Sequence, residues 1–480
     1  MATSDPAGAK SAGELNIVHV TLIASAAAMG GFLFGYDSSV INGAVDAIQD
    51  HFQVTAAMTG FTVAAALLGS ALGAGLAGSL ADRLGRIRVM QIAGVLFAVS
   101  AIGSAVPFSI FDLAAWRVVG GVAIGMASVI APTYIAEVSP PAYRGRLASL
   151  QQLAIVLGIA LSQLVNYLVA GAAGGSAQNM LGPLQAWQWM LGVEMVPALV
   201  YIALTLTIPE SPRYLVRIGR DDKARQVLTE VEGGDVDRRI TEIRQALGSE
   251  VRPRLRDLKG GRFGLLPIVW IGMALSAFQQ LVGINVVFYY SSSLWQSVGV
   301  DESNSLLLSL FTSIVNIIGT FIAIGLVDRI GRKPLLLIGS AGMAVSLGMT
   351  GWAFSHATVV GASASLAFGW GVVALTSASA FVMFFALSWG VVTWVLLGEM
   401  FPLRIRAAAM AVATATQWLT NWLITVSFPT LRDWNLTGTY MIYTLFAVLS
   451  LVFVWKFISE TKGKTLESMG QEAPEEATAK

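Results

Sequence analysis

Long apolar stretches recur along nearly the whole chain, and short polar segments separate them. A helix of about 20 apolar residues crosses the hydrocarbon core of a bilayer, and twelve stretches reach that length. Backbone groups in lipid must pair within their own segment, so each stretch is predicted to be a helix. The stretches are roughly 18–40, 58–80, 88–107, 113–136, 147–170, 188–208, 265–292, 306–327, 334–354, 368–397, 407–430 and 438–458. The pattern predicts an all-α membrane protein with twelve transmembrane helices.

Composition agrees with a bilayer as the solvent. Charged residues make up 12% of the 480 residues and hydrophobic residues 55%. Soluble proteins carry about 25% charged residues, so a water-soluble globule of this size is excluded. The chain has no cysteine, which excludes disulfides and thiol chemistry. We expect no metal, no cofactor and no nucleic-acid partner, and a monomer surrounded by membrane lipid.

The positions of the basic residues predict the orientation. Among the gaps that follow odd-numbered helices, only Arg432 is basic, and nearly all other Lys and Arg residues lie in even-numbered gaps or beyond the first and last helices. Basic residues collect on the cytoplasmic side, so both termini are expected in the cytoplasm of a multi-pass plasma-membrane protein.

The chain divides into two halves of six helices. Asp82 and Arg86 follow the second predicted helix, and Asp328 and Arg332 follow the eighth. Two further motifs recur in the same order, and six-helix repeats are a transporter architecture with the substrate held between the halves. The expected segments are an N-terminal tail (1–17), a first half (18–208), a cytoplasmic linker of amphipathic helices (209–262), a second half (263–458) and a C-terminal tail (459–480).

The repeated cytoplasmic motifs are predicted to act as gates. Gly85 and Gly331 permit tight turns between helices, beside acid and base partners that can pair across the halves when the inner side is shut. The alternative is that these charges only mark loop ends. The predicted gate residues here are Asp82, Arg86, Glu137, Arg144, Asp328, Arg332, Glu399 and Arg406.

These motifs resemble the sugar porter family of the major facilitator superfamily, over about 18–466. The resemblance rests on GSLADRLGR, AEVSPPAYRGR, PESPRYL, QQLVGINVVFYYS, DRIGRKP, GEMFPLRIR and ETKGKT. The chain looks most like the bacterial proton-coupled glucose and xylose symporters. The resemblance implies the major facilitator fold and sugar transport by alternating access.

Uncharged amides inside the predicted helices suggest a sugar site. Asn and Gln both donate and accept hydrogen bonds, as sugar hydroxyls require, and amides in a membrane are costly unless used. They could also serve only as hydrogen bonds between helices. The predicted helices carry Gln152, Gln279, Gln280, Asn285, Asn316, Gln417 and Asn421. Gln280 and Asn285 flank Gly283, where the seventh helix can break and turn its ends toward a ligand.

The resemblance assigns roles within this set. It implies that all these amides except Asn421 contact the sugar. It also implies that Trp394 stacks on the sugar, that Phe34 closes over it, and that Tyr289 and Tyr290 form an outer gate. Many relatives carry Gly-Pro before this tryptophan. The chain has Gly390-Val391 instead, so we expect the tenth helix to hinge at Gly390.

Few charges lie at membrane depth: Asp37, Arg117 and Glu194. A charge there costs about 2.5–3.5 kcal/mol, so it suggests function. Burial disfavours the charged carboxylate and a nearby guanidinium favours it, so Asp37 could take a proton outside and release it inside. The resemblance implies that Asp37 and Arg117 couple proton to sugar. A static buried ion pair is the alternative, and Glu194 has no assigned role.

The sequence therefore predicts a proton-coupled monosaccharide symporter, with D-glucose as the expected sugar. A facilitative uniporter is the alternative, and a sugar sensor on the same fold is a more distant one. We do not expect an enzyme, because the three histidines are far apart in the sequence. Gly463-Lys464-Thr465 matches the end of a P-loop, but the position five residues before Gly463, where the P-loop requires glycine, is Ile458.

Overall fold

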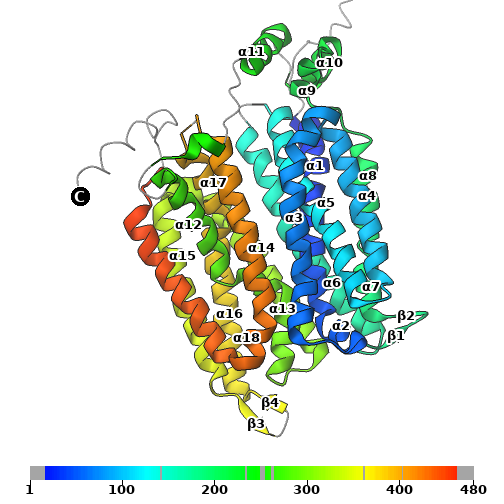
Figure 1. Ribbon diagram of the computed structural model, residues 1–480, viewed down its shortest axis with the longest axis vertical. Coiled ribbons are helices and arrows are strands. Elements are labelled where there is room, and N and C mark those ends of the chain that lie inside the picture. Colours follow the sequence, from blue (N-terminus) through cyan, green and yellow to red (C-terminus); the bar gives the residue numbers. More distant parts are fainter. Residues whose placement is uncertain are drawn as a thin grey trace, which may run out of the picture.

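The computed structural model describes residues 17–140, 143–232, 235–248, 255–260, 264–360, 363–402 and 404–461. These residues form a bundle of long helices in two groups that lie side by side (Figure 1). Apolar side chains such as Phe108, Phe111 and Trp455 are exposed on its outer surface, as lipid requires.

The first group contains the first six predicted spans. They are α1 (Ile17–Val40), α3 (Ala56–Leu84), α4 (Arg86–Ala105), α5 (Ile110–Val138), α6 (Arg144–Ala172) and the pair α7 (Ala186–Gly192) and α8 (Met195–Thr205). Short elements complete this group: η1 (Ile41–Gly43), α2 (Val45–Phe52) and the antiparallel hairpin of β1 (Met180–Leu181) and β2 (Leu184–Gln185).

The second group contains the remaining spans. They are the pair α12 (Pro267–Leu281) and α13 (Ile284–Ser297), α14 (Glu302–Ile330), α15 (Arg332–Phe354), the pair α16 (Phe368–Leu387) and α17 (Trp389–Met400), and α18 (Arg406–Phe457). A hairpin of β3 (Thr358–Val360) and β4 (Ser363–Ser365) joins α15 to α16.

The last element contains two helices. Its 52 residues would extend for about 78 Å at 1.5 Å per residue, more than twice the thickness of a bilayer core. Asn435 has non-helical backbone angles (φ −165°, ψ 103°), so the chain turns there. Eleven helical segments of the described chain are long and apolar enough to span a membrane, and dividing α18 at Asn435 gives the twelve predicted.

The linker between the halves is helical where it is described. It contains α9 (Pro212–Arg217), α10 (Asp221–Val231), α11 (Val236–Gly248) and η2 (Leu255–Leu258). Helices α9 to α11 lie at the end of the bundle where α1 begins and α18 ends (Figure 1). Both β-hairpins lie at the opposite end, called the outer end below.

Three of the spans are interrupted. The seventh breaks at Gly283, which has φ +82°, so the predicted break is confirmed. The sixth breaks between α7 and α8, next to Glu194. The tenth breaks at Ser388 (φ −130°, ψ −88°), so the prediction of a hinge at Gly390 is wrong by two residues. The Ser388 hydroxyl donates to the Phe384 carbonyl (2.6 Å), which supplies a partner at the break.

Glycines bring α1 and α6 into contact. A Cβ on Gly35 would lie 2.0 Å from the Ile155 carbonyl oxygen, and one on Gly158 would lie 2.0 Å from that of Phe32. Only glycine allows two backbones to approach this closely. The contact fixes the position of α1 two residues before Asp37.

Candidate functional site

A buried ion pair joins α1 to α5. Arg117 Nη1 donates to Asp37 Oδ1 at 2.6 Å, and the same guanidinium lies 3.3 Å from the Asp37 carbonyl oxygen. The two residues are 1% and 2% exposed. The structure therefore brings together the two charges that the sequence predicted as a pair.

Glu194 is the third charge of this site. It lies at the break between α7 and α8, is 3% exposed, and its carboxyl group faces that of Asp37. Within the described part of the chain, no N–H or O–H group donates to Asp37 Oδ2 or Glu194 Oε1. Gly120 leaves room for Asp37 Oδ2, which lies 3.4 Å from where a Cβ at that position would sit.

The charges of the site do not cancel when both carboxyl groups are ionised. Two carboxylates and one guanidinium leave one negative charge in a buried place, which is costly. One proton would neutralise it, and a proton shared by the two facing carboxyl groups would supply the missing donor. The arrangement can therefore hold one exchangeable proton.

Three amides form a chain around the Gly283 break. Asn285 Nδ2 donates to Gln280 Oε1 (2.5 Å), and Gln280 Nε2 lies 3.4 Å from Gln279 Oε1. Gln279 Nε2 in turn donates to the Trp389 carbonyl (2.9 Å), at the start of α17. Both broken spans of the second half therefore meet at this chain of amides.

The other predicted amides differ in their surroundings. Asn316 on α14 is buried, while Gln152 on α6 and Gln417 on α18 are partly buried. Gln417 Oε1 is itself buried and has no hydrogen-bond partner within the described residues. It can accept a hydrogen bond from a ligand hydroxyl. Asn421 Oδ1 accepts from Thr425 (3.1 Å).

The four predicted aromatic residues have different surroundings. Trp394 on α17 is 38% exposed, and Phe34 on α1 packs against Trp418 with ring centroids 5.9 Å apart. Tyr290 turns into the second half, where its hydroxyl donates to the Thr425 carbonyl (3.0 Å). Tyr289 faces Asn421 of the second half and Ser38 of the first.

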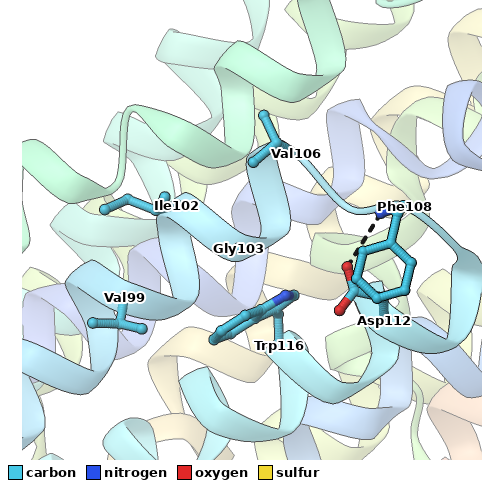
Figure 2. A pocket seen from close by; sticks show the side chains of 7 residues that line it. All are labelled: Val99, Ile102, Gly103, Val106, Phe108, Asp112 and Trp116. Carbon is cyan, nitrogen blue, oxygen red and sulfur yellow. Dashed lines mark hydrogen bonds between the residues drawn. The ribbon is translucent and has the colours of Figure 1, made fainter.

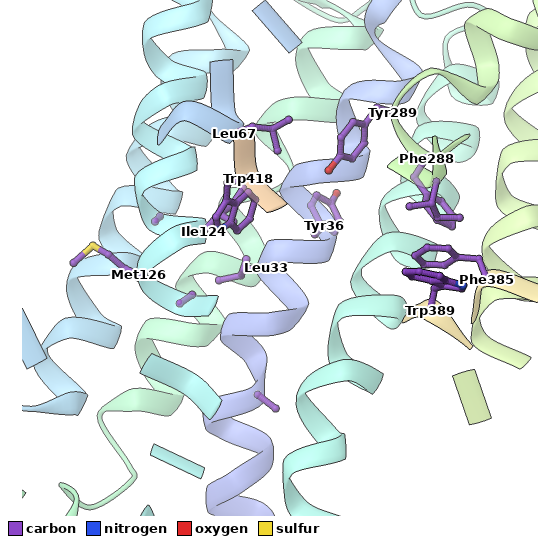
Figure 3. Packing of buried hydrophobic residues seen from close by; sticks show 14 of the residues in the cluster. Leu33, Tyr36, Leu67, Ile124, Met126, Phe288, Tyr289, Phe385, Trp389 and Trp418 are labelled. Carbon is purple, nitrogen blue, oxygen red and sulfur yellow. The ribbon is translucent and has the colours of Figure 1, made fainter. Parts of the chain in front are cut away.

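Figure 3 shows the hydroxyl ends of Tyr36 and Tyr289 turned toward each other, while Trp418 lies beside Ile124. Trp418 was missed by the sequence analysis, although it follows Gln417 directly. Its position could have been found from that neighbour.

Polar contacts close the outer end between the halves, and the sequence analysis missed them. The Ser292 backbone N–H donates to Asn42 Oδ1 (2.9 Å), and Gln163 Nε2 lies 3.3 Å from the Phe288 carbonyl oxygen. Asn42 also donates to Gln163 (2.9 Å). Asn42 and Gln163 belong to the first half, while Phe288 and Ser292 lie on α13.

Comparison with known proteins gives a consistent result. The sugar (and other) transporter family matches residues 23–473. The chain is 54% identical to a glucose transport protein of Synechocystis, covering 97% of this chain and all of the relative. It is 37% identical to the D-xylose-proton symporter of Escherichia coli, covering 94% of this chain and 95% of that protein.

The chain belongs to the sugar transporter family. It has the major facilitator fold, and its structure is similar to solved structures of the E. coli xylose transporter at 35–36% identity. The partially occluded inward-open form gives a TM-score of 0.80, covering 93% of this chain and 100% of that one. The inward-open form gives 0.79, covering 95% and 99%.

The family's repeated motif forms a matched cluster in each half of this transporter. Arg86 makes two hydrogen bonds of 2.9 Å to Glu137, which also accepts from Ser211. Glu210 accepts from the backbone N–H groups of Arg86 and Ile87 (3.0 and 3.3 Å).

The second half repeats this cluster with corresponding residues. Arg332 makes hydrogen bonds of 2.9 and 3.2 Å to Glu399, which also accepts from Thr461 (2.6 Å). Glu460 accepts from the Arg332 backbone N–H (3.1 Å). Gly85 and Gly331 have φ of +96° and +104°, so the predicted turns are confirmed.

Two of the remaining predicted gate residues have partners in the structure. Asp82 pairs with Arg217, and Arg406 Nε donates to the Phe401 carbonyl (3.0 Å). The side chains of Arg144 and Asp328 lie outside the described residues. Pairing across the halves in an inner-shut conformation stays a prediction.

A recess of about 310 Å³ lies on the outer surface, away from these groups (Figure 2). Its lining is apolar except for Asp112, whose carboxylate accepts from the Phe108 backbone N–H (3.2 Å). This acid lies in the first turn of α5, and the rest of the lining consists of Val99, Ile102, Gly103, Val106, Phe108 and Trp116.

Proposed function

We propose that this chain is a proton-coupled monosaccharide symporter that works by alternating access, with D-glucose as the expected sugar. The relatives support this assignment, because the matched proteins include a glucose transport protein and proton symporters for xylose and arabinose. The observation that carries it is the buried group of Asp37, Arg117 and Glu194.

Protonation of this group has a mechanical consequence. When Asp37 is ionised, its 2.6 Å bond to Arg117 ties α1 to α5. A proton on Asp37 removes the charge attraction, so the two helices can move relative to each other. A membrane potential of about 100 mV supplies about 2.3 kcal/mol per charge, enough for roughly 50-fold accumulation of a neutral sugar.

The sugar would bind to the amides of the second half. Gln279, Gln280 and Asn285 would exchange hydrogen bonds with its hydroxyl groups, and Gln417 offers an unused acceptor. Trp394 would supply an apolar face. Gln152, Asn316 and Phe34 complete the proposed site, with Tyr289 and Tyr290 toward the outer end.

Alternating access is supported by the closed outer end and by the similarity to inward-facing structures. The proposed orientation has both termini in the cytoplasm of the plasma membrane, with α9 to α11 on the same side. A monomer with halves at 18–208 and 263–458 is the proposed unit. The cluster around Arg86 would stiffen the first half and the cluster around Arg332 the second, so that each half moves as one body.

Uptake into proteoliposomes tests the function. Purified protein is supplied with labelled glucose, xylose, galactose and arabinose, with and without an imposed inward pH gradient. Glucose accumulation that depends on the gradient is expected. Equal uptake with and without the gradient would mean a uniporter, and no uptake of any sugar would refute transport of these monosaccharides.

Asp37→Asn tests the coupling residue. This variant is expected to exchange labelled for unlabelled sugar across the membrane but to lose accumulation, because the titrating group is gone. Asp112→Asn is the matched control, since that acid lies in the first turn of α5 at the lipid surface and should leave accumulation intact. Gradient-driven accumulation by Asp37→Asn would refute the role of Asp37.

A further inference from the structure

One hydroxyl group makes a further contact between the two halves at the outer end, apart from the coupling site and from the contacts of Asn42 and Gln163. Ser293 on α13 donates to Asp46 Oδ1 on α2 at 2.6 Å and accepts a hydrogen bond from Arg432 on α18. Asp46 belongs to the first half, and Ser293 and Arg432 belong to the second. We propose that Asp46, Ser293 and Arg432 form an outer gate that holds the halves together when the outer side is shut.

The chemistry of the three groups makes the contact directional. A carboxylate can only accept hydrogen bonds and a guanidinium can only donate them, while a hydroxyl does both. While Asp46 is ionised, Ser293 therefore has one favourable orientation between them, and each of its two hydrogen bonds is charge-assisted. Opening the outer side must separate α2 from α13, which breaks the bond to Asp46 and returns this carboxylate to water.

The gate also explains the one exception in the distribution of basic residues. Arg432 is the only Lys or Arg in the gaps on the outer side, where the orientation rule disfavours it. Its side chain is 13% exposed and also pairs with Asp433 (Nη2–Oδ1 2.9 Å). Asp50 on α2 and Glu302 on α14 add negative charge around Asp46. Arg432 thus supplies positive charge to a cluster of acidic side chains that contains Asp46, Asp50, Glu302 and Asp433.

The surroundings of Asp46 set the direction of its response to protons. Burial raises the pKa of Asp46 in the shut conformation. The hydrogen bond from Ser293 and the charge of Arg432 lower this pKa by a smaller amount, and the negative charges of Asp50 and Glu302 raise it further. In the open conformation Asp46 is solvated and has an ordinary pKa of about 3.9. The shut conformation therefore binds a proton more tightly, so acid on the outer side favours shutting.

The direction of this response suits import driven by protons. The shut state gains stability as the outer pH falls through the raised pKa of Asp46, and the gain is complete below about 3.9. Outer acid would thus promote the closing step that follows loading. This inference rests on the alternating access proposed above, and it adds a second proton-responsive group, distinct from Asp37.

Distance measurements across the outer mouth test the gate. The natural chain has no cysteine, so two introduced cysteines carry the only spin labels. Met180 on β1 and Phe368 at the start of α16 are exposed and belong to different halves. Double electron–electron resonance on the Met180→Cys/Phe368→Cys protein reports the fractions of shut and open molecules between pH 4 and 8.

The gate variants are measured in the Asp37→Asn background, which removes titration at the coupling aspartate. The parent is expected to shift toward the shorter distance as the pH falls. Asp46→Asn should abolish this shift, while Asp50→Asn, the matched control on the same helix, should retain it. Ser293→Ala should lower the ratio of shut to open molecules about tenfold through loss of a charge-assisted bond, and Ser293→Thr should restore it.

Two results would overturn the gate. Asp46→Asn could show the same pH-dependent shift as its parent, or Ser293→Ala could leave the shut fraction unchanged. Either result would leave the proposed symport intact, because uptake is measured separately. A different result would refute alternating access together with the gate. It is a single distance in every variant, including the protein with native Asp37, at every pH and both with and without sugar.

Discussion

The matched clusters of the two halves allow a controlled measurement of burial and stability. Glu137 and Glu399 occupy corresponding positions, each with two hydrogen bonds to an arginine and one from a hydroxyl group. Their exposure differs. The Glu137 side chain is 10% exposed and that of Glu399 is 25% exposed. We predict that Glu137→Ala destabilises the protein more than Glu399→Ala.

The expected sizes follow from the partner that is left behind. Without Glu137, the guanidinium of Arg86 stays buried with the Ala81 carbonyl (3.1 Å) and a longer contact to Asp82 (3.8 Å). Breaking a buried pair from one side costs about 3–5 kcal/mol. Water reaches Glu399 more easily and screens the pair, so we expect roughly half that cost there.

Thermal unfolding in detergent, followed by tryptophan fluorescence, measures the difference. At on the order of 2 °C per kcal/mol for a chain of this size, Glu137→Ala should lower the Tm by about 6–10 °C and Glu399→Ala by about 3–5 °C. Glu242→Ala is the control, because that glutamate pairs with Arg238 and Arg239 on the exposed helix α11, and it should leave the Tm unchanged. An equal or larger loss for Glu399→Ala would refute the argument from burial.

Two further predictions concern the sugar site and the packing of α1. Gln280→Ala should weaken sugar binding about tenfold, because a buried sugar hydroxyl loses its hydrogen-bond partner. Calorimetry measures the affinity, with Gln178→Ala as the control. Equal affinities for the two variants would remove Gln280 from the site. Gly35→Ala should sharply reduce the folded yield, because its Cβ would lie 2.0 Å from the Ile155 carbonyl oxygen. Gly75→Ala is the control and should keep the yield, because a Cβ there would meet nothing within 4 Å. Equal yields in size-exclusion chromatography would contradict the close contact.

The fold followed from the sequence because the length of an apolar stretch is a local property. Each predicted span corresponds to a helix or a broken pair of helices, including the break at Gly283, where a positive φ calls for glycine. The break at Ser388 was misplaced because a serine hydroxyl can bond either to a backbone carbonyl or to another helix, and the sequence does not say which.

The sequence predicted the pairing of Asp37 with Arg117, but it could not show which groups the arginines of the repeated motifs contact. Arg86 was expected to pair across the halves when the inner side is shut, and in this structure it binds Glu137 in its own half. Motif spacing shows that an acid and a base lie at the same end of the bundle, while the choice of partner depends on how the helices pack. The outer contact of Asn42 with Ser292 was missed for the same reason.

The structure also suggests how a proton in one half can affect a sugar in the other. The charged group lies in the first half and most of the amides lie in the second. Tyr289 faces both Ser38, the residue after Asp37 on α1, and Asn421 on the amide-bearing helix α18. Movement of α1 on release of Arg117 would therefore displace Tyr289 from one of its two neighbours. Since coupling is reciprocal, sugar binding at the amides would in turn change the proton affinity of Asp37, as a symporter requires.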